Sequence, residues 1–188
     1  MSIFDNLKKA AGDAVKSAVN NASQTTETFT FAALPESVDE MKALPEASLD
    51  TPFKAAALTV CSLCAYAAEP SVGIEMLNFL KGPQPLSPYE IQFLRDRFMD
   101  GKTYVPFSYF AGATPENDYT PTEPFTLTIH TNPYSYQDEG YCTLWLRSGG
   151  ADSERQIKLR CKGGTTWFLW EQFLLPDIRQ PKSADPWA

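Results

Sequence analysis

The second half of the chain consists of short stretches in which apolar and polar residues alternate. These stretches, FTLTIHT, YCTLWLRS, RQIKLRC and TTWFLWE, begin at residues 125, 141, 155 and 165. Alternation with a period of two is typical of strands that bury one face, and the short turns between the stretches predict an antiparallel meander. Because such a sheet has one apolar face, the rest of the chain must provide a layer that covers it.

Three helices are predicted before these strands, over residues 52–68, 70–81 and 88–101. Each begins with a proline, which is favoured in the first turn of a helix. The first helix is apolar on nearly every side, which indicates that it is buried. The order of elements predicts an α+β fold, in which an N-terminal helical layer packs on a C-terminal four- or five-stranded antiparallel meander sheet. The fifth strand would be YVPFSYF, at an edge of the sheet because Pro106 cannot donate a ladder hydrogen bond.

The chain is expected to contain one domain and an N-terminal extension. Residues 1–24 are predicted to form an amphipathic helix and a linker, and residues 28–188 a single α+β domain. This domain would consist of a helical part at 28–101, the sheet at 102–175 and a surface tail at 176–188, which Trp187 would anchor.

Charge and composition exclude several classes of function. With 16 lysines and arginines against 23 acidic residues, the net charge is −7, so no nucleic-acid partner is expected. No stretch is apolar enough to span a membrane, and the N-terminus does not resemble a secretory signal. We therefore expect a cytoplasmic protein with reduced thiols. Membrane contact through residues 2–19 is an alternative, which Asp5 and Asp13 disfavour because they offset the lysines of that segment.

The cysteines and the single histidine offer little chemistry. Cys61 and Cys64 have the C-x-x-C spacing but lie well inside the first predicted helix, so burial in the core is preferred over a redox centre. A zinc site needs about four ligands, and Cys142, Cys161 and His130 do not supply them in the predicted register. Without a recognisable nucleophile, phosphate or metal motif, we expect no catalytic residues, no metal and no cofactor.

The turns between the last strands predict which residues share a face of the sheet. A two-residue turn at the glycines 163–164 pairs Leu159 with Phe168, and a symmetric loop before residue 155 pairs Cys142 with Cys161. The predicted core face comprises Leu144, Leu146, Ile157, Leu159, Phe168 and Trp170. The opposite face carries Trp145, Lys158, Arg160, Trp167 and Leu169.

The interleaved rings and cations on that opposite face are the main candidate site. Trp145, Trp167, Lys158 and Arg160 could form an open aromatic platform for an anionic ligand or an acidic segment of a partner. The alternative, which the residues favour, is ordinary packing of these side chains under a helix or the C-terminal tail. The loop NPYSYQDEGY adds Tyr134, Tyr136 and Tyr141, either as a recognition loop or as rings that pack the loop itself.

Four phrases of the chain resemble a known bacterial family. FLKGPQPLSPYE, YVPFSYFAGATPENDYTP, NPYSYQDEGY and the terminal SADPWA are similar to those of an uncharacterised domain-of-unknown-function family, whose members also open with a helix like MSIFD. The resemblance covers most of the chain. It implies a cytoplasmic bacterial protein and carries no known activity or site residues.

Together, these observations predict a cytoplasmic binding or protein-interaction module without catalytic activity. Its partner would be an unknown protein or a small anionic ligand. The alternative is a small-molecule pocket between the helices and the sheet, with or without catalysis, which would show a cavity with a polar group inside.

Overall fold

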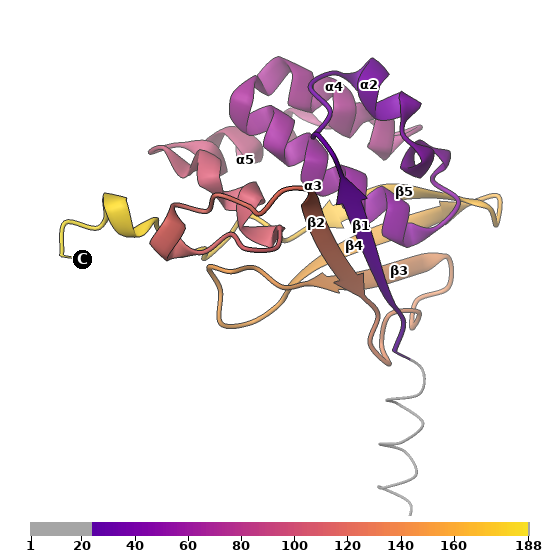
Figure 1. Ribbon diagram of the computed structural model, residues 1–188. Helices are drawn as coiled ribbons and strands as arrows, with labels where there is room; N and C mark the ends of the chain where they lie inside the picture. Colours follow the sequence, from indigo (N-terminus) through magenta and orange to yellow (C-terminus); the bar gives the residue numbers. More distant parts are fainter. Residues whose placement is uncertain (1–23, 188) are drawn as a thin grey trace, which may run out of the picture.

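The computed structural model describes residues 24–187, which form a layer of helices on a curled five-stranded sheet (Figure 1). The predicted helix over residues 2–19 lies outside the described residues. The strands are β1 (Thr26–Phe31), β2 (Phe125–His130), β3 (Tyr141–Leu146), β4 (Arg155–Lys162) and β5 (Thr166–Gln172). The helices are α2 (Val38–Ala43), α3 (Pro52–Ala68), α4 (Pro70–Lys81) and α5 (Pro88–Phe98), and four 3-10 segments are η1 (Pro45–Ser48), η2 (Lys102–Tyr109), η3 (Pro115–Asn117) and η4 (Lys182–Ala184).

The strands are arranged in the order β1-β2-β3-β4-β5, and every neighbouring pair is antiparallel. Helices α2, α3 and α4 lie on one side of this sheet (Figure 1). The predicted α+β fold, with a helical layer on an antiparallel sheet, is confirmed. Among the described residues, no helix is long and apolar enough to cross a membrane.

The fifth strand is not the one that the sequence predicted. YVPFSYF belongs largely to the 3-10 segment η2, and only Phe110 forms an isolated bridge, to Leu127. The edge position next to β2 is taken by β1, in which Phe29 pairs with Leu127. The sequence TETFTF of β1 does alternate, with Phe29 and Phe31 buried and its threonines exposed.

Helix α3 forms the centre of the core. Fourteen of its 17 residues are buried, and the hydroxyls of Thr59 and Ser62 donate to backbone carbonyls four residues earlier. Cys61 and Cys64 are among the buried residues, as predicted. Gly73 allows α4 to approach closely, because a Cβ at this position would lie 2.3 Å from Tyr66 Cβ.

The predicted registers are partly wrong. Between β3 and β4 the observed pairing is two residues away, with Cys142 opposite Leu159, so the same side chains remain in the core. Between β4 and β5 the turn is one residue longer, with Lys162 opposite Thr166, and Leu159 therefore pairs with Leu169. A one-residue shift exchanges the two faces of a strand, so Leu169 is buried in place of the predicted Phe168 and Trp170.

The C-terminal tail is attached through its first residues. Tyr119 donates a hydrogen bond of 2.6 Å from its hydroxyl to the carbonyl of Arg179, and Ile178 is buried. Trp187 is 92% exposed, so the prediction that it anchors the tail is wrong.

Candidate functional site: the open face of the sheet

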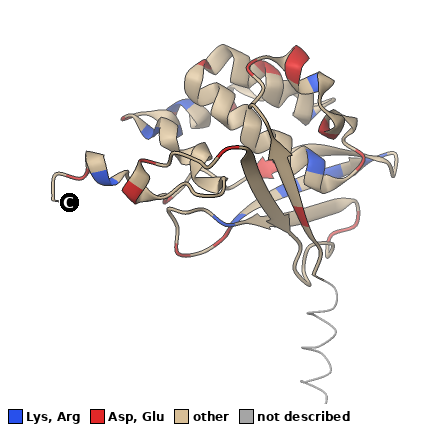
Figure 2. Ribbon diagram, viewed as in Figure 1, with Lys and Arg blue, Asp and Glu red and all other residues tan. Residues whose placement is uncertain are grey.

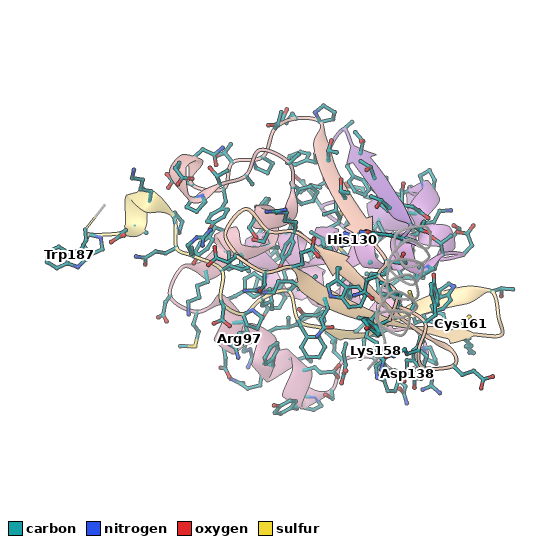
Figure 3. All side chains as sticks on the ribbon, turned by 90° about the horizontal axis from the view of Figure 1, so that it is seen from below. Arg97, His130, Asp138, Lys158, Cys161 and Trp187 are labelled. Atoms are coloured by element: carbon teal, nitrogen blue, oxygen red, sulfur yellow. The ribbon has the colours of Figure 1, made fainter. Side chains whose placement is uncertain are left out.

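The face of the sheet opposite the helices is covered by no helix of the described chain, as Figure 3 shows from below. We call it the open sheet face. In each central strand, the residues on this face alternate with residues on the other face that are buried, except at the start of β2 and the ends of β4. Its members are Thr128, His130, Tyr141, Thr143, Trp145, Gln156, Lys158 and Arg160. Four of the predicted site residues, Tyr141, Trp145, Lys158 and Arg160, therefore lie together.

Arg160 lies over two adjacent aromatic rings. Its guanidinium carbon lies 4.9 Å from the centre of the Trp170 ring and 5.5 Å from that of Tyr141. These two rings meet edge to face, with their centres 5.5 Å apart. A guanidinium over aromatic faces is favoured electrostatically and keeps its polar edge free for a ligand. The predicted combination of rings and cations is present, with Trp170 as its second ring.

Lys158 forms an ion pair, so its positive charge is not available to a ligand in the way that the sequence suggested. Its Nζ lies 2.7 Å from Asp138 Oδ2 and 4.8 Å from the centre of the Tyr141 ring. The hydrogen bond with Asp138 raises the pKa of Lys158, with further contributions from the charges of Asp138 and Glu171. The Lys158–Asp138 pair is locally neutral, whereas Arg160 forms no salt bridge with a described carboxylate.

The tyrosine-rich loop rises at one end of the open sheet face. Ser135 is buried, where its hydroxyl accepts a hydrogen bond from the Asn132 N–H and its carbonyl accepts one from the Thr143 N–H. Tyr134 and Tyr136 are 63% and 58% exposed. Between loop and sheet is a shallow hollow of about 190 Å³, whose lining includes Tyr134, Asp138, Tyr141, Thr143, Trp145 and Gln156. This volume is smaller than ligand pockets usually are, so the hollow suits a side chain better than a metabolite.

Trp167 does not join the platform, contrary to the prediction. It pairs with Cys161 and lies on the side of β5 that carries Leu169, because the β4–β5 register differs by one residue. There it packs edge-on against Tyr136, with 6.5 Å between ring centres. Trp170 takes its place next to Arg160. Leu159 pairs with Leu169 while Lys158 pairs with Glu171, so Trp170 is the extra residue of a bulge, which no local sequence signal marks.

The described residues show no arrangement typical of catalysis or metal binding. His130 Nε2 lies 3.1 Å from Glu154 Oε2 at the end of the open sheet face. Burial raises the pKa of the Cys61 and Cys64 thiols, and it raises the pKa of Cys142 to about 11, so these are poor nucleophiles. Within residues 24–187, no three His, Cys, Asp or Glu side chains are grouped to hold a metal ion.

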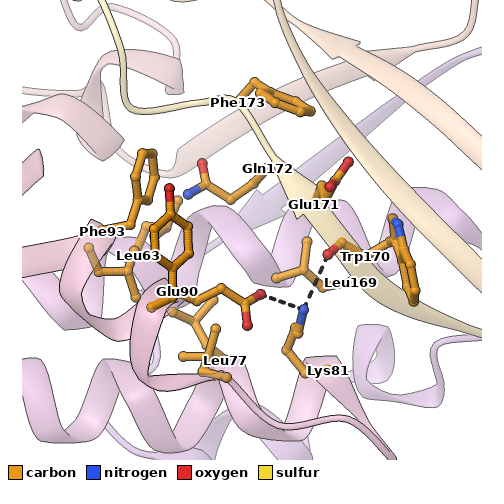
Figure 4. Close-up of a pocket in the computed structure, with 13 residues that line it drawn as sticks. Leu63, Leu77, Lys81, Glu90, Phe93, Leu169, Trp170, Glu171, Gln172 and Phe173 are labelled. Atoms are coloured by element: carbon orange, nitrogen blue, oxygen red, sulfur yellow. Dashed lines mark hydrogen bonds and ion pairs between the residues drawn. The ribbon is translucent and has the colours of Figure 1, made fainter.

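Two cavities lie where the alternative function would place a pocket. The first, of about 190 Å³, lies between α4, α5 and β5, where Lys81 Nζ contacts Glu90 Oε1 at 2.7 Å and the Trp170 carbonyl at 3.2 Å (Figure 4). The second is an apolar groove of about 650 Å³, whose lining includes Leu34, Ala65, Val72, Phe107 and Phe125. The groove has the size of a ligand site, and its polar groups are the carboxylates of Glu36, Glu69 and Glu123.

Comparison with known proteins agrees with the resemblance seen in the sequence. The model of one family, described as a domain of unknown function (DUF6935), matches residues 33–182. Neither the curated proteins nor the solved structures contain a match to the chain. The match covers the helical layer and strands β2 to β5, including every residue of the open sheet face, and it begins after β1. The chain therefore belongs to the DUF6935 family of domains of unknown function.

Proposed function

We propose that this protein is a non-catalytic interaction module of the bacterial cytoplasm, and that its open sheet face binds a flexible segment of a partner protein. The observation that carries the proposal is the position of Arg160 over the adjacent rings of Tyr141 and Trp170, on a sheet face that no described helix covers.

The chemistry of this face suits a polypeptide. Tyrosine and tryptophan rings provide contact area and lose little conformational entropy on binding. Thr143 lies between Tyr141 and Trp145 on β3, Gln156 lies opposite Trp145 on β4, and both offer hydrogen-bonding groups next to the rings. Arg160 has no carboxylate partner among the described side chains, so the bound segment is expected to supply an acidic residue.

The experiment selects peptides from a random displayed library on the immobilised full-length protein. Selected peptides should be enriched in Asp or Glu next to apolar residues. Arg160→Gln and Trp145→Ala should each weaken their binding by at least about tenfold, as expected for residues at the centre of an interface.

Matched controls come from the same chain. Arg97 is an exposed arginine whose guanidinium carbon lies 5.0 Å from the Phe93 ring centre, and Arg97→Gln therefore controls for Arg160→Gln. Trp187→Ala controls for Trp145→Ala. If selected peptides bind all four variants equally, or if none is enriched, the open sheet face is not a peptide-binding surface.

The apolar groove supports a second candidate function, binding of a small molecule. Its volume of about 650 Å³ lies in the usual range of ligand pockets. Native mass spectrometry of the freshly purified full-length protein tests this directly. A bound molecule that is lost in Ala65→Trp, which fills the groove, would favour the pocket over the interaction module.

A further inference from the structure

A further cavity with a different chemistry lies where β4 turns into β5. It measures about 580 Å³, and we call it the hairpin pocket. Its lining comprises Lys81, Pro83, Gln84, Arg160, Cys161, Lys162, Gly163, Phe168, Leu169 and Trp170. The α4–α5 connection forms one wall, and the hairpin strands form the others. The volume is sufficient for a small organic molecule.

The charge of the hairpin pocket is opposite to that of the protein. Three of its ten lining residues are Lys or Arg and none is acidic, although the chain carries a net charge of −7. Figure 2 shows blue segments along β4, which contains Lys158, Arg160 and Lys162. Lys81 is neutralised by Glu90, whereas Arg160 and Lys162 form no salt bridge with any described residue. Two free cations therefore face a cavity without a counter-ion.

The apolar part of the pocket is flat and fixed in position. Phe168 packs against Gly82, where an added Cβ would lie 2.4 Å from the ring, and the φ of +60° favours glycine at that position. The Trp170 ring is held by Arg160 and Tyr141. Rigid aromatic walls next to free cations select a ligand that is itself planar and negatively charged.

We propose that the hairpin pocket binds a small organic anion with a planar apolar body, of the class of aromatic carboxylates. The carboxylate lies between Arg160 and Lys162, and the planar body lies between the side chains of Phe168 and Trp170. This site shares Arg160 and Trp170 with the open sheet face, but it needs no partner protein and does not depend on the proposed peptide binding.

The pocket contains its own reporter. The protein has four cysteines; Cys61, Cys64 and Cys142 are buried, and only Cys161, in the lining of the pocket, is partly accessible. Alkylation of Cys161 by iodoacetamide, followed by intact mass, therefore measures whether the pocket is filled. The probe is 1-naphthoate, and its neutral counterpart is 1-naphthalenemethanol. We expect 1-naphthoate to slow alkylation at least about fivefold at saturation, and the alcohol to have little effect at equal concentration, because two cations favour the charged form.

The variants Arg160→Gln and Lys162→Gln should each raise the 1-naphthoate concentration that gives half-maximal protection by about tenfold, as is typical when one charged hydrogen bond is lost. Protection is taken as the ratio of rates with and without probe, which cancels any change in the reactivity of the thiol. Arg97→Gln and Lys102→Gln remove exposed cations elsewhere and should leave protection unchanged.

Two outcomes would overturn the proposal: equal protection by the acid and the alcohol, or no protection by millimolar 1-naphthoate. The result is separable from that of the peptide experiment. Trp145→Ala should weaken peptide binding without changing the protection of Cys161, whereas Lys162→Gln should change the protection of Cys161 alone.

Discussion

Lys81 joins three elements of the fold, and its replacement by methionine is the perturbation with the clearest expected size. The Lys81 side chain is only 9% exposed, and its ammonium group donates to Glu90 Oε1 at 2.7 Å and to the Trp170 carbonyl at 3.2 Å. It thereby connects α4 with α5 and with the bulge of β5 (Figure 4). Methionine preserves the apolar stem and removes both hydrogen bonds.

The size of the effect follows from the exposure of each partner. A hydrogen bond to a charged group contributes about 1.5–3 kcal/mol net, and the lower end applies here because the Glu90 side chain is 37% exposed. The Trp170 carbonyl also loses its contact with the ammonium group. We therefore expect Lys81→Met to lower the free energy of unfolding by about 2 kcal/mol. Glu90→Gln should cost about 1 kcal/mol, since glutamine can still accept from Ser87 in the capping box.

The assay is a double-mutant cycle by urea unfolding, with Lys81→Met, Glu90→Gln and the double variant. We expect a coupling energy of about 1 kcal/mol near neutral pH. Burial alone would raise the pKa of Glu90, but the hydrogen bonds from Lys81 and Ser87 outweigh it and lower the pKa below the ordinary 4.5. The pair therefore stabilises the fold above the unfolded pKa and loses this contribution as the pH falls through the folded value.

The reasoning would be refuted by a coupling energy below about 0.3 kcal/mol near neutral pH, the value of a solvent-screened surface pair. It would also be refuted by a coupling that persists unchanged in acid, after Glu90 is protonated. In either case the contribution of Lys81 would come from its stem, and the geometry of the ion pair would be incidental.

Three further predictions concern the core and the register. Gly73→Ala should lower the free energy of unfolding in urea by about 2 kcal/mol, although alanine favours helices. The reason is that the added Cβ would lie within 2.6 Å of the Tyr66 backbone. A gain in stability would contradict this packing. Leu169→Ala should lower the free energy of unfolding by about 3 kcal/mol, because it truncates a buried side chain. A change near zero would indicate that Leu169 lies on the open sheet face and not in the core. In the native protein, peptide mapping after brief iodoacetamide treatment should find Cys161 alkylated and Cys61 unmodified, whereas equal labelling of both would contradict the burial of α3.

The boundaries of the main helices were predictable because local chemistry specifies them. Helix α3 begins at Pro52, with the Thr51 hydroxyl accepting from the Lys54 N–H, and α5 begins at Pro88, after a capping box between Ser87 and Glu90. The continuous apolar sequence of α3 was enough to predict its burial. Only the end of α5 differed, at Phe98 instead of Gly101.

Strand partners were less accessible to sequence reasoning, because they depend on contacts between distant segments. TETFTF alternates, but nothing near it indicates that it pairs with β2, about a hundred residues later. Conversely, YVPFSYF has the composition of a strand, yet Pro106 and the presence of β1 leave it as a 3-10 segment with a single bridge.

The sequence by itself determined the helical layer, the alternating faces of β2, β3 and β4, and the presence of Trp145, Lys158 and Arg160 on one surface. Only the tertiary structure decided which residues of β5 lie on each face of the sheet. A turn longer by one residue and a bulge at Trp170 placed Trp167 against Tyr136 and Trp170 under Arg160. The physical reason is that side chains alternate with a period of two, so a shift of one residue exchanges the faces of a strand. The observed β4–β5 register is the one that buries Leu169 in the core.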